Sequence, residues 1–330
     1  MILTPKGQVS TNKIALLELG TDFSKKLLKY RELKKLTSTY TEPILANLDK
    51  NNRLHSMFNQ ARTVTGRLSS SNPINLQNIP SRTQLGKKVR EVFIVDKGLK
   101  LLVLDFNQIE LRLIAHFSQD ANMLKAYKEG VDIHEQTAKG IFNTQSPTKE
   151  QRFIGKTCNF SISYGAGSKK LAQTINQGEL GVKVTEEETK GILERFNTLY
   201  SGIKAWKRGV WYATRHAGYI KTLLGRVIPI QGFKGSWKEV SQAERDSVSY
   251  LVQGSAADIM KKSIIELIGL YPNLQMVSTV HDELLIELDE EEASDPTYCL
   301  MNIDNVLSHV VKLSIPLKVD LKVVNNWGEK

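Results

Sequence analysis

Two short apolar segments that end at acidic residues constrain most strongly what this chain can fold into. The first reads LKLLVLD (99–105), and the second places MVSTV (276–280) and LLIEL (284–288) on either side of His281-Asp282-Glu283. Short apolar runs of this kind predict buried strands, and the second pair predicts a β-hairpin with acids at its tip. The fold therefore needs a sheet that can carry acids at the ends of its strands.

Most of the remaining sequence has helical periodicity. Residues 14–36 predict two helices broken near Gly20, and residues 108–117, most of 119–232 and 240–268 are also helical in pattern. Strands at the centre and end of the chain with helices between them predict an α+β fold. A length of 330 residues predicts two packed subdomains, because a single core seldom grows past ~250–300 residues.

Residues 61–90 form the one long segment without a period. They are rich in Ser, Asn, Gln and Arg, which predicts a polar loop. A loop of this length is uncommon in a compact domain unless it binds something.

Composition excludes several classes of protein. A hydrophobic fraction of 41% is too high for a disordered chain, and no stretch of ~18 apolar residues is present to cross a membrane. The N-terminus has no apolar run after a basic start, so no secretory signal is expected. Cys158 and Cys299 fit neither a metal-binding spacing nor a disulfide framework. We expect a soluble, intracellular, globular protein.

The positive charge is unevenly distributed. The net charge is +10, but residues 1–100 hold 18 Lys or Arg against 7 Asp or Glu, whereas residues 101–330 hold 27 against 28. A partner with the charge density of phosphate would explain this surplus, because neutralising each phosphate releases counterions. A solvated surface would explain it equally well, so charge alone leaves both interpretations open.

Asp105 and Asp282 are candidate metal ligands. Acids at the ends of buried strands are costly unless a cation neutralises them, and two such acids brought together would repel. Divalent cations with oxygen ligands relieve that repulsion. Two such ions ~3.5–4 Å apart can polarise the nucleophile and the leaving group of a phosphoryl transfer. On spacing alone, ordinary turn acids remain the alternative.

Four residues in the segment 151–167 recur every four positions. Arg152, Lys156, Phe160 and Tyr164 drift only ~40° per step around a helix, so they line one side of it. Two cations and two aromatic rings suit a flat, charged ligand, with the cations on phosphates and the rings on a base or sugar. A solvated amphipathic face is the alternative. Gly155 in the same helix costs ~1 kcal/mol relative to Ala, which indicates that the helix is not optimised for stability.

At these residues the sequence resembles the family A DNA polymerases, the bacterial DNA polymerase I type. The matching segments are VLDFNQIELR (103–112, motif A), RFIGKTCNFSISYG (152–165, motif B), VHDE (280–283, motif C), TGRLSSSNPINLQNIP (65–80), DIHEQTA (132–138) and QGSAADIMK (253–261). The likeness runs from about residue 7 to Trp327 with the motifs in the family's order. It implies a palm built on an antiparallel sheet with helices, a mainly helical fingers subdomain, and a thumb that is largely absent.

The resemblance implies roles for the matching residues in catalysis and nucleotide binding. Asp105 and Asp282 would bind two Mg²⁺ ions as the catalytic aspartates, with Glu283 as a weaker contributor. Lys156 would bind the triphosphate and protonate the leaving pyrophosphate. Glu110 resembles the steric gate that excludes a ribose 2′-OH, with Tyr164 holding it. The residues implied to bind the dNTP are Gln108, Glu110, His134, Arg152, Lys156, Phe160 and Tyr164.

A further set is implied to bind primer–template DNA. Arg67 and Gln253 resemble the pair that hydrogen-bonds the minor groove near the primer end, where every correct base pair presents acceptors. His281 would lie near the primer terminus. The complete set is Arg31, Lys35, Arg67, Asn75, Gln77, Asn78, Gln253 and His281.

The resemblance also implies an organisation into subdomains. Residues 1–60 would be the end of the thumb with basic DNA-contacting helices, 61–118 the first part of the palm, 119–232 the fingers, and 233–330 the second part of the palm. No Asp-x-Glu exonuclease signature occurs in the first hundred residues, so we expect no proofreading from this chain.

The leading hypothesis is a polymerase core that extends a primer 3′-OH with dNTPs, acting in DNA replication or repair. The alternative is a DNA-binding fragment that needs a thumb-containing partner chain for activity; the partner chain expected for this protein is one that contains a thumb or an exonuclease. A single-subunit RNA polymerase is disfavoured by the bulk of Glu110. The expected location is the cytoplasm and nucleoid, or the host cytoplasm if the chain is viral, with no membrane partner.

Overall fold

The structure is a computed structural model that describes residues 7–81, 83–178, 180–295 and 301–330. The chain divides into two compact units. One comprises Met1–Asn59, Ser69–Val95 and Val324–Lys330, and the other comprises Gln60–Leu68 and Asp96–Val323. We call them unit 1 and unit 2 and describe each by itself.

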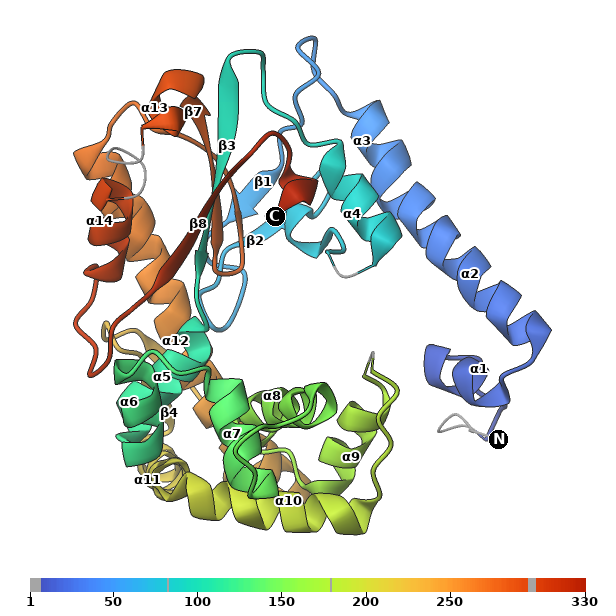
Figure 1. Cartoon of the computed structure of the whole chain (residues 1–330), viewed down its shortest axis with the longest axis vertical. Helices are drawn as coiled ribbons and strands as arrows, with labels where there is room; N and C mark the ends of the chain where they lie inside the picture. Colours follow the sequence, from blue (N-terminus) through green and yellow to red (C-terminus); the bar gives the residue numbers. More distant parts are fainter. Residues whose placement is uncertain (1–6, 82, 179, 296–300) are drawn as a thin grey trace. The chain divides into compact units, whose positions relative to one another are not determined.

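Unit 1 begins with a helical hairpin. Helices α1 (Lys13–Leu19) and α2 (Asp22–Leu36) are separated at Gly20, which confirms the predicted break. Gly20 has φ 63°, a conformation that glycine adopts at no steric cost, and the side chain of Thr21 then caps α2 by accepting from the Ser24 N–H. A π-helical turn, η1 (Thr37–Thr41), continues α2 into α3 (Glu42–Ala46), so that the three form one rod (Figure 1).

The rest of unit 1 is built from short elements. Strands β1 (Met57–Asn59) and β2 (Ser69–Ser71) pair antiparallel, and η2 (Leu76–Asn78) and α4 (Gln84–Glu91) follow. The polar loop predicted over 61–90 is therefore wrong in its last third, where Thr83 caps α4 by accepting from the Gly86 N–H. The C-terminal η4 (Trp327–Glu329) completes the unit, with the Arg90 guanidinium 4.1 Å from the centre of the Trp327 ring.

The centre of unit 2 is a four-stranded sheet in the order β6-β7-β3-β8. Its strands are β3 (Leu99–Phe106), β6 (Gln275–Val280), β7 (Glu283–Asp289) and β8 (Val319–Val324). The β6–β7 hairpin and the β3–β7 pair are both antiparallel. The predicted strand at 99–105 and the predicted hairpin at 276–288 are thus confirmed, and they are neighbours in one sheet.

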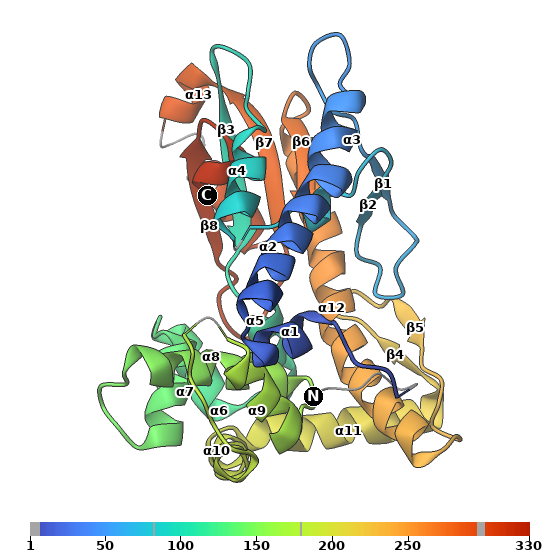
Figure 2. The same ribbon diagram turned by 90° about the vertical axis from the view of Figure 1, so that its right-hand side faces the viewer.

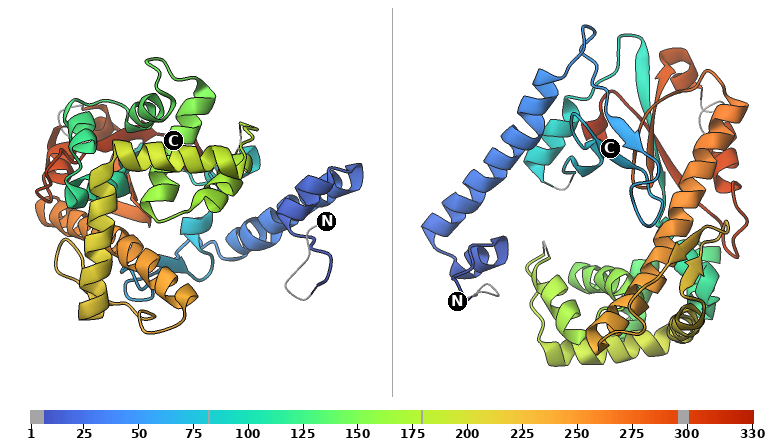
Figure 3. Two further views of the ribbon diagram at one scale, coloured as in Figure 1. Left: turned by 90° about the horizontal axis from the view of Figure 1, so that it is seen from below. Right: turned by 180° about the vertical axis from the view of Figure 1, so that it is seen from behind.

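Helices make up most of the remainder of unit 2. They are α5 (Ile109–Ser118), α6 (Ala121–Lys128), α7 (Ile133–Phe142), α8 (Lys149–Ser163), α9 (Ser168–Asn176), α10 (Glu186–Leu199), α11 (Ser201–Ala217), α12 (Trp237–Leu270), α13 (Glu290–Ser294) and α14 (Asp304–Ser308). A small hairpin of β4 (Tyr219–Lys221) and β5 (Val227–Pro229), which the helical pattern did not predict, interrupts them. Helix α12 runs from beside the sheet to this hairpin (Figures 2 and 3).

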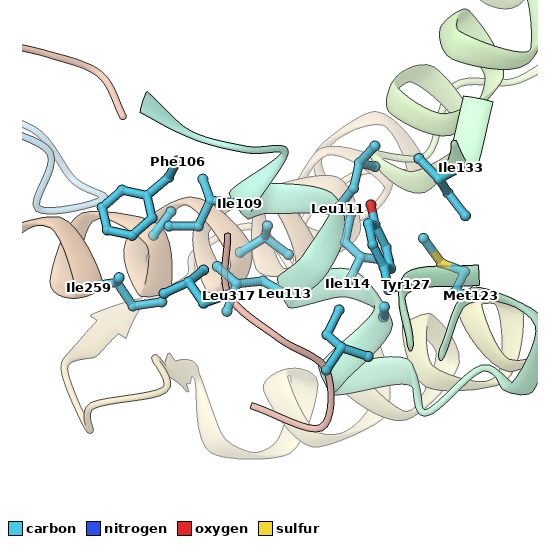
Figure 4. Packing of buried hydrophobic residues seen from close by; sticks show 14 of the residues in the cluster. Phe106, Ile109, Leu111, Leu113, Ile114, Met123, Tyr127, Ile133, Ile259 and Leu317 are labelled. Carbon is cyan, nitrogen blue, oxygen red and sulfur yellow. The ribbon is translucent and has the colours of Figure 1, made fainter. Parts of the chain in front are cut away.

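One apolar core extends through unit 2. Leu104 of β3, Ile114 of α5 and Ile259 of α12 are each at most 2% exposed and belong to the same cluster. Figure 4 shows α5 side chains packed from Phe106 and Ile259 at one end to Tyr127 at the other. Because this core joins the sheet to the helices beyond α5, residues at the ends of β3 and β7 are held rigidly relative to α5 and α8. Within the described part of the chain, none of the helices has both the length and the apolar character that crossing a membrane requires.

Candidate active site

The acids of two distant segments lie at one end of the sheet of unit 2. Asp105 of β3 is directly opposite Glu283 of β7 in the antiparallel register, and the Phe106 N–H donates to the Asp282 carbonyl oxygen over 3.1 Å. Directly opposed residues of antiparallel strands project from the same face. The tight turn of the hairpin places His281 in the left-handed region at φ 59°. The structure therefore brings together the predicted metal ligands, Asp105 and Asp282, and Glu283 beside them.

The chemistry of these acids fits a hard divalent cation. Mg²⁺ is usually bound by one or two carboxylates, with waters and substrate phosphates completing its octahedron. Within the described ranges, no group of three or more His, Cys, Asp or Glu side chains forms a self-sufficient metal site. Asp105 and Asp282 supply two carboxylates, the number with which Mg²⁺ is usually bound where substrate phosphates provide further ligands.

Helix α8 carries the predicted stripe of cations and aromatic rings. It begins with a capping box between Thr148 and Gln151. Arg152 and Lys156 are exposed, while Phe160 and the C-cap residue Tyr164 are partly buried. The stripe thus grades from charged to apolar along the helix, as binding a phosphate at one end and a ring at the other requires.

Asp132 links two of the predicted phosphate-binding residues. Its Oδ1 caps α7 by accepting from the backbone N–H of His134, and its Oδ2 accepts from both Nε and Nη2 of Arg152, over 3.0 and 2.5 Å. A carboxylate paired with Arg in this two-pronged way has a fixed orientation. Burial opposes ionisation of Asp132, but the hydrogen bonds from Arg152 and from the backbone N–H groups of Glu135 and His134, with the charge of Arg152, outweigh it and lower the pKa of Asp132.

The hydrogen bonds of His134 define its tautomer. The Asn159 Nδ2 amide lies 2.9 Å from His134 Nδ1, and because the same nitrogen donates to the Ile133 carbonyl oxygen over 3.3 Å, the amide nitrogen faces the ring. Nδ1 is then the acceptor, and Nε2 carries the proton. Burial, with Lys156 and Arg152 nearby, lowers the pKa of His134 to about 4 despite Asp132. A neutral His134 that donates through Nε2 can still bind a phosphate oxygen at neutral pH.

Gly155 lets α7 and α8 approach closely. A Cβ built on Gly155 would lie 2.5 Å from the carbonyl oxygen of His134 and 3.0 Å from the Ala138 nitrogen. From the sequence, Gly155 indicates only that the helix is not optimised for stability. The structure gives a specific reason for the glycine, because any side chain here would collide with α7. The absence of a side chain at Gly155 allows the backbone of His134 to pack directly against α8.

Glu110 on α5 is held from two directions. Arg67 Nη2 donates to Glu110 Oε1, and the Tyr164 hydroxyl donates to Glu110 Oε2. The Glu110 side chain is only 19% exposed. Burial, followed by the charge of Glu110, raises the pKa of the Tyr164 hydroxyl well above its usual range, so it remains a donor. The structure thus joins Glu110 to Tyr164, as the sequence predicts, and adds Arg67.

The predicted minor-groove pair makes other contacts. Gln253 Nε2 donates to Ser249 Oγ, one turn back on α12, over 3.0 Å. Arg67 donates to Glu110, as described above, and both residues belong to unit 2. The side-chain hydrogen bonds described for Arg67 and Gln253 are thus to Glu110 and Ser249.

The other predicted DNA-binding residues lie in unit 1. Lys35 is exposed on α2, and the Arg31 guanidinium donates to the carbonyl oxygen of Thr11. Asn75 caps η2, and the buried Gln77 accepts from the Ser70 N–H. Asn78 is exposed, and its carbonyl oxygen accepts from the Tyr40 hydroxyl. Gln77 therefore stabilises the loop itself.

Sequence reasoning missed several residues that hold the site together. The carboxylate of Asp258 on α12, 6% exposed, accepts from Arg226 and Thr222 beside the Gly66 turn, and Asn159 orients His134. Asp132, which pairs with Arg152, was also missed. Its position directly before a predicted helix, in the matched DIHEQTA segment, was the one sequence signal that could have indicated a capping role. Asn159 and Asp258 lie inside helices, where periodicity says nothing about polar partners.

Comparison with known proteins identifies the family. The sequence model of "DNA polymerase family A" matches residues 2–329. DNA polymerase I, thermostable, of Thermus thermophilus is 39% identical over 311 residues, which cover 92% of this chain and 36% of that protein. DNA polymerase I of Treponema pallidum is 36% identical over 313 residues, covering 93% of this chain and 30% of that protein. The chain spans about a third of the length of these relatives.

A solved structure has the same fold. It is the POL domain of Pol1 from M. smegmatis in complex with DNA primer-template and dNTP, with a TM-score of 0.90 and 31% sequence identity. The match covers 99% of this chain and 57% of that one. The predicted fold of a polymerase palm and fingers is confirmed by this likeness.

Proposed function

Because the chain belongs to DNA polymerase family A, we propose that it extends a DNA primer with dNTPs on a DNA template. The primer 3′-oxygen attacks the α-phosphorus of the dNTP, an O3′–P bond forms, the bond from the α-phosphorus to its bridging oxygen breaks, and pyrophosphate leaves. The POL domain of M. smegmatis, which binds primer-template and dNTP, supports the same ligands for this chain.

The observation that carries the proposal is the meeting of Asp105 with Asp282 and Glu283 at one end of the sheet. Asp105 and Asp282 would hold two Mg²⁺ ions, with Glu283 contributing more weakly. Bound there, the ions supply charge stabilisation for the attacking and leaving oxygens.

Residues on α5, α7 and α8 would bind the nucleotide. Arg152, Lys156 and the neutral His134 face the phosphates, and Lys156 is the proton donor to the leaving pyrophosphate. Phe160 packs against the sugar and base. Glu110, held by Tyr164 and Arg67, fills the space that a ribose 2′-OH would need, and Gln108 lies near the nucleotide.

Donors along the chain would bind the duplex without reading its sequence. Arg67 and Gln253 meet minor-groove acceptors near the primer end, and His281 lies near the primer terminus. The remaining proposed contacts to primer and template are Arg31, Lys35, Asn75, Gln77 and Asn78. In this proposal residues 1–60 end the thumb, 61–118 and 233–330 form the palm, and 119–232 form the fingers.

A second candidate is a DNA-binding fragment that polymerises only with a partner chain containing a thumb. The first hundred residues carry a surplus of 11 positive charges, which favours DNA binding by itself. The presence of both aspartates and of the triphosphate-binding cations argues against a chain that has lost catalysis, because such charged groups are costly to keep without use.

Primer extension with the purified chain, four dNTPs and Mg²⁺ at low salt tests the proposal. Extension by the wild type, and by neither Asp105→Ala nor Asp282→Ala, is the expected result. Primer–template binding without extension would overturn activity of the chain alone, and adding a thumb-containing fragment in trans would then show whether a partner restores it. A 3′-mismatched primer should stay intact without dNTPs, since we propose no exonuclease in this chain.

A further inference from the structure

We infer that Tyr127 is a positioning residue for nucleotide selection, whose hydroxyl holds the side chain of Gln108 so that the amide nitrogen is the group offered to the incoming nucleotide. The inference deepens the proposed function and rests on it. It assigns a role to a buried residue of α6 outside the stripe of α8 and outside the acids of the sheet.

The ring of Tyr127 is fixed within the core. Tyr127 is 6% exposed and packs among the residues of α5 and α6 (Figure 4). The guanidinium of Arg112 lies 4.6 Å from the centre of its ring. Arg112 is itself anchored, since it donates to the carbonyl oxygens of Asn107 and Pro316 over 2.8 and 2.7 Å. Because core packing and the Arg112 guanidinium fix the ring of Tyr127, its hydroxyl has a defined position.

That hydroxyl contacts the residue between the acids of motif A. It donates to Gln108 Oε1 over 3.0 Å. Gln108 lies between Asp105 and Glu110 in sequence and has φ 52° and ψ 38°, a left-handed conformation rare for a residue with a side chain. Such a strained turn persists only where the surroundings hold it, and it often marks a functional position.

The direction of this hydrogen bond orients the amide. A buried O–H needs an acceptor, and Gln108 Oε1 supplies it. Burial raises the pKa of the Tyr127 hydroxyl, so it stays protonated and remains a donor at neutral pH. The carbonyl end of the amide is therefore taken by Tyr127, and both N–H donors of Nε2 are kept for other partners. Phosphate and sugar oxygens of a nucleotide are acceptors, so this orientation is the one that suits a dNTP.

A cycle of two substitutions tests the inference. Tyr127→Phe removes one oxygen and keeps the ring that Arg112 covers, and Gln108→Met keeps the length of the side chain without its amide. Single-nucleotide incorporation gives KM for dNTP and kcat for the wild type, both single variants and the double variant. Tyr212→Phe, which removes an exposed tyrosine hydroxyl from α11, is the matched control, and thermal unfolding of all the proteins reports on their folding.

We expect Tyr127→Phe to raise KM for dNTP by about 3- to 10-fold, the loss of one hydrogen bond, with kcat nearly unchanged. Gln108→Met should raise KM at least as much, the double variant should be no worse than Gln108→Met, and Tyr212→Phe should behave as the wild type. With an active wild type, an unchanged KM in Tyr127→Phe, or effects that multiply in the double variant, would overturn the inference alone. A wild type that extends no primer would overturn the proposed function and this inference together.

Discussion

Glu110 shows how much positioning a single carboxylate can require. It is 19% exposed and accepts from both Arg67 and Tyr164, so neither oxygen can turn away from its partner. A side chain fixed in this way can act through its volume, because its displacement would leave two partly buried donors without their acceptor.

Removing that volume should change sugar selection. We predict that Glu110→Ala raises the ratio of kcat/KM for a ribonucleotide to that for the matching deoxynucleotide by about 10- to 100-fold. Tyr164→Phe, which removes one of the two donors and keeps the ring, should raise the ratio less. Competition between rNTP and dNTP on a defined template measures both. An unchanged ratio in Glu110→Ala would remove the gate assignment.

His134 should make the stability of the fold depend on pH. Its pKa is lowered to about 4 in the folded protein from an ordinary value near 6.5, so the unfolded chain binds more protons between these values. The stability that His134 contributes is therefore present above about pH 6.5 and is lost as the pH falls toward 4. Relative to His134→Gln, the wild type should lose about 2 kcal/mol of unfolding free energy between pH 7 and pH 4.5. Urea denaturation of both proteins measures this, and equal losses would contradict it.

At the scale of secondary-structure elements, the close contact of α7 and α8 is the critical one. Gly155 permits this contact. A glycine inside a helix lowers helix stability, and here the packing of α8 against α7 offsets that loss. The contact places the backbone of His134 beside the helix that carries Arg152 and Lys156, so in the proposed function the two helices would form one phosphate-binding surface.

Two glycine substitutions separate this role from helix propensity. Gly155→Ala should cost about 1–3 kcal/mol of unfolding free energy, because its Cβ would lie 2.5 Å from the His134 oxygen, and it should raise KM for dNTP. Gly209 lies within α11 with nothing near its Cβ position, so Gly209→Ala should stabilise the protein by up to about 1 kcal/mol. If both variants were stabilised, helix propensity would outweigh packing at Gly155.

Elements with a strong period were predictable from sequence. The strands at 99–105 and 276–288 were found because buried strands are apolar along their length, and α12 because its apolar pattern persists over many turns. Helix α4 was missed because only Leu85 and Val89 of its eight residues, QLGKKVRE, are apolar, too few to stand out from the polar segment around them. The three-residue strands β4 and β5 are too short to interrupt a helical pattern.

The residues of the candidate site also differ in how far the sequence could predict them. Strand ends and helical spacing indicated Asp105, Asp282 and the stripe of α8, whereas the roles of Glu110 and His134 came from the family resemblance. The resemblance implied the contact of Tyr164 with Glu110, but other contacts between distant polar side chains, such as Tyr127 with Gln108, were predicted from neither source. They depend on how helices pack, and a sequence without its fold does not record that.

At the scale of the whole molecule, the positive charge surplus and the proposed catalytic residues lie in different parts of the sequence. The first hundred residues hold the entire positive surplus, and residues 101–330, which contain the acids and the stripe of α8, are nearly neutral. Affinity for DNA should then depend on the first hundred residues, whereas the proposed catalytic acids would act only on DNA that is already bound.

Salt dependence tests that division. Lys35 is exposed on α2, so Lys35→Ala should weaken primer–template binding at low salt and reduce the slope of log affinity against log salt by about 0.9, the value for one phosphate contact. Lys190→Ala, which removes an exposed cation that pairs with Glu187 on α10, is the matched control and should leave the slope unchanged. Fluorescence anisotropy of a labelled duplex across a salt series measures both slopes. Equal slopes for wild type and Lys35→Ala would mean that Lys35 contacts no phosphate, and would remove it from the proposed DNA contacts.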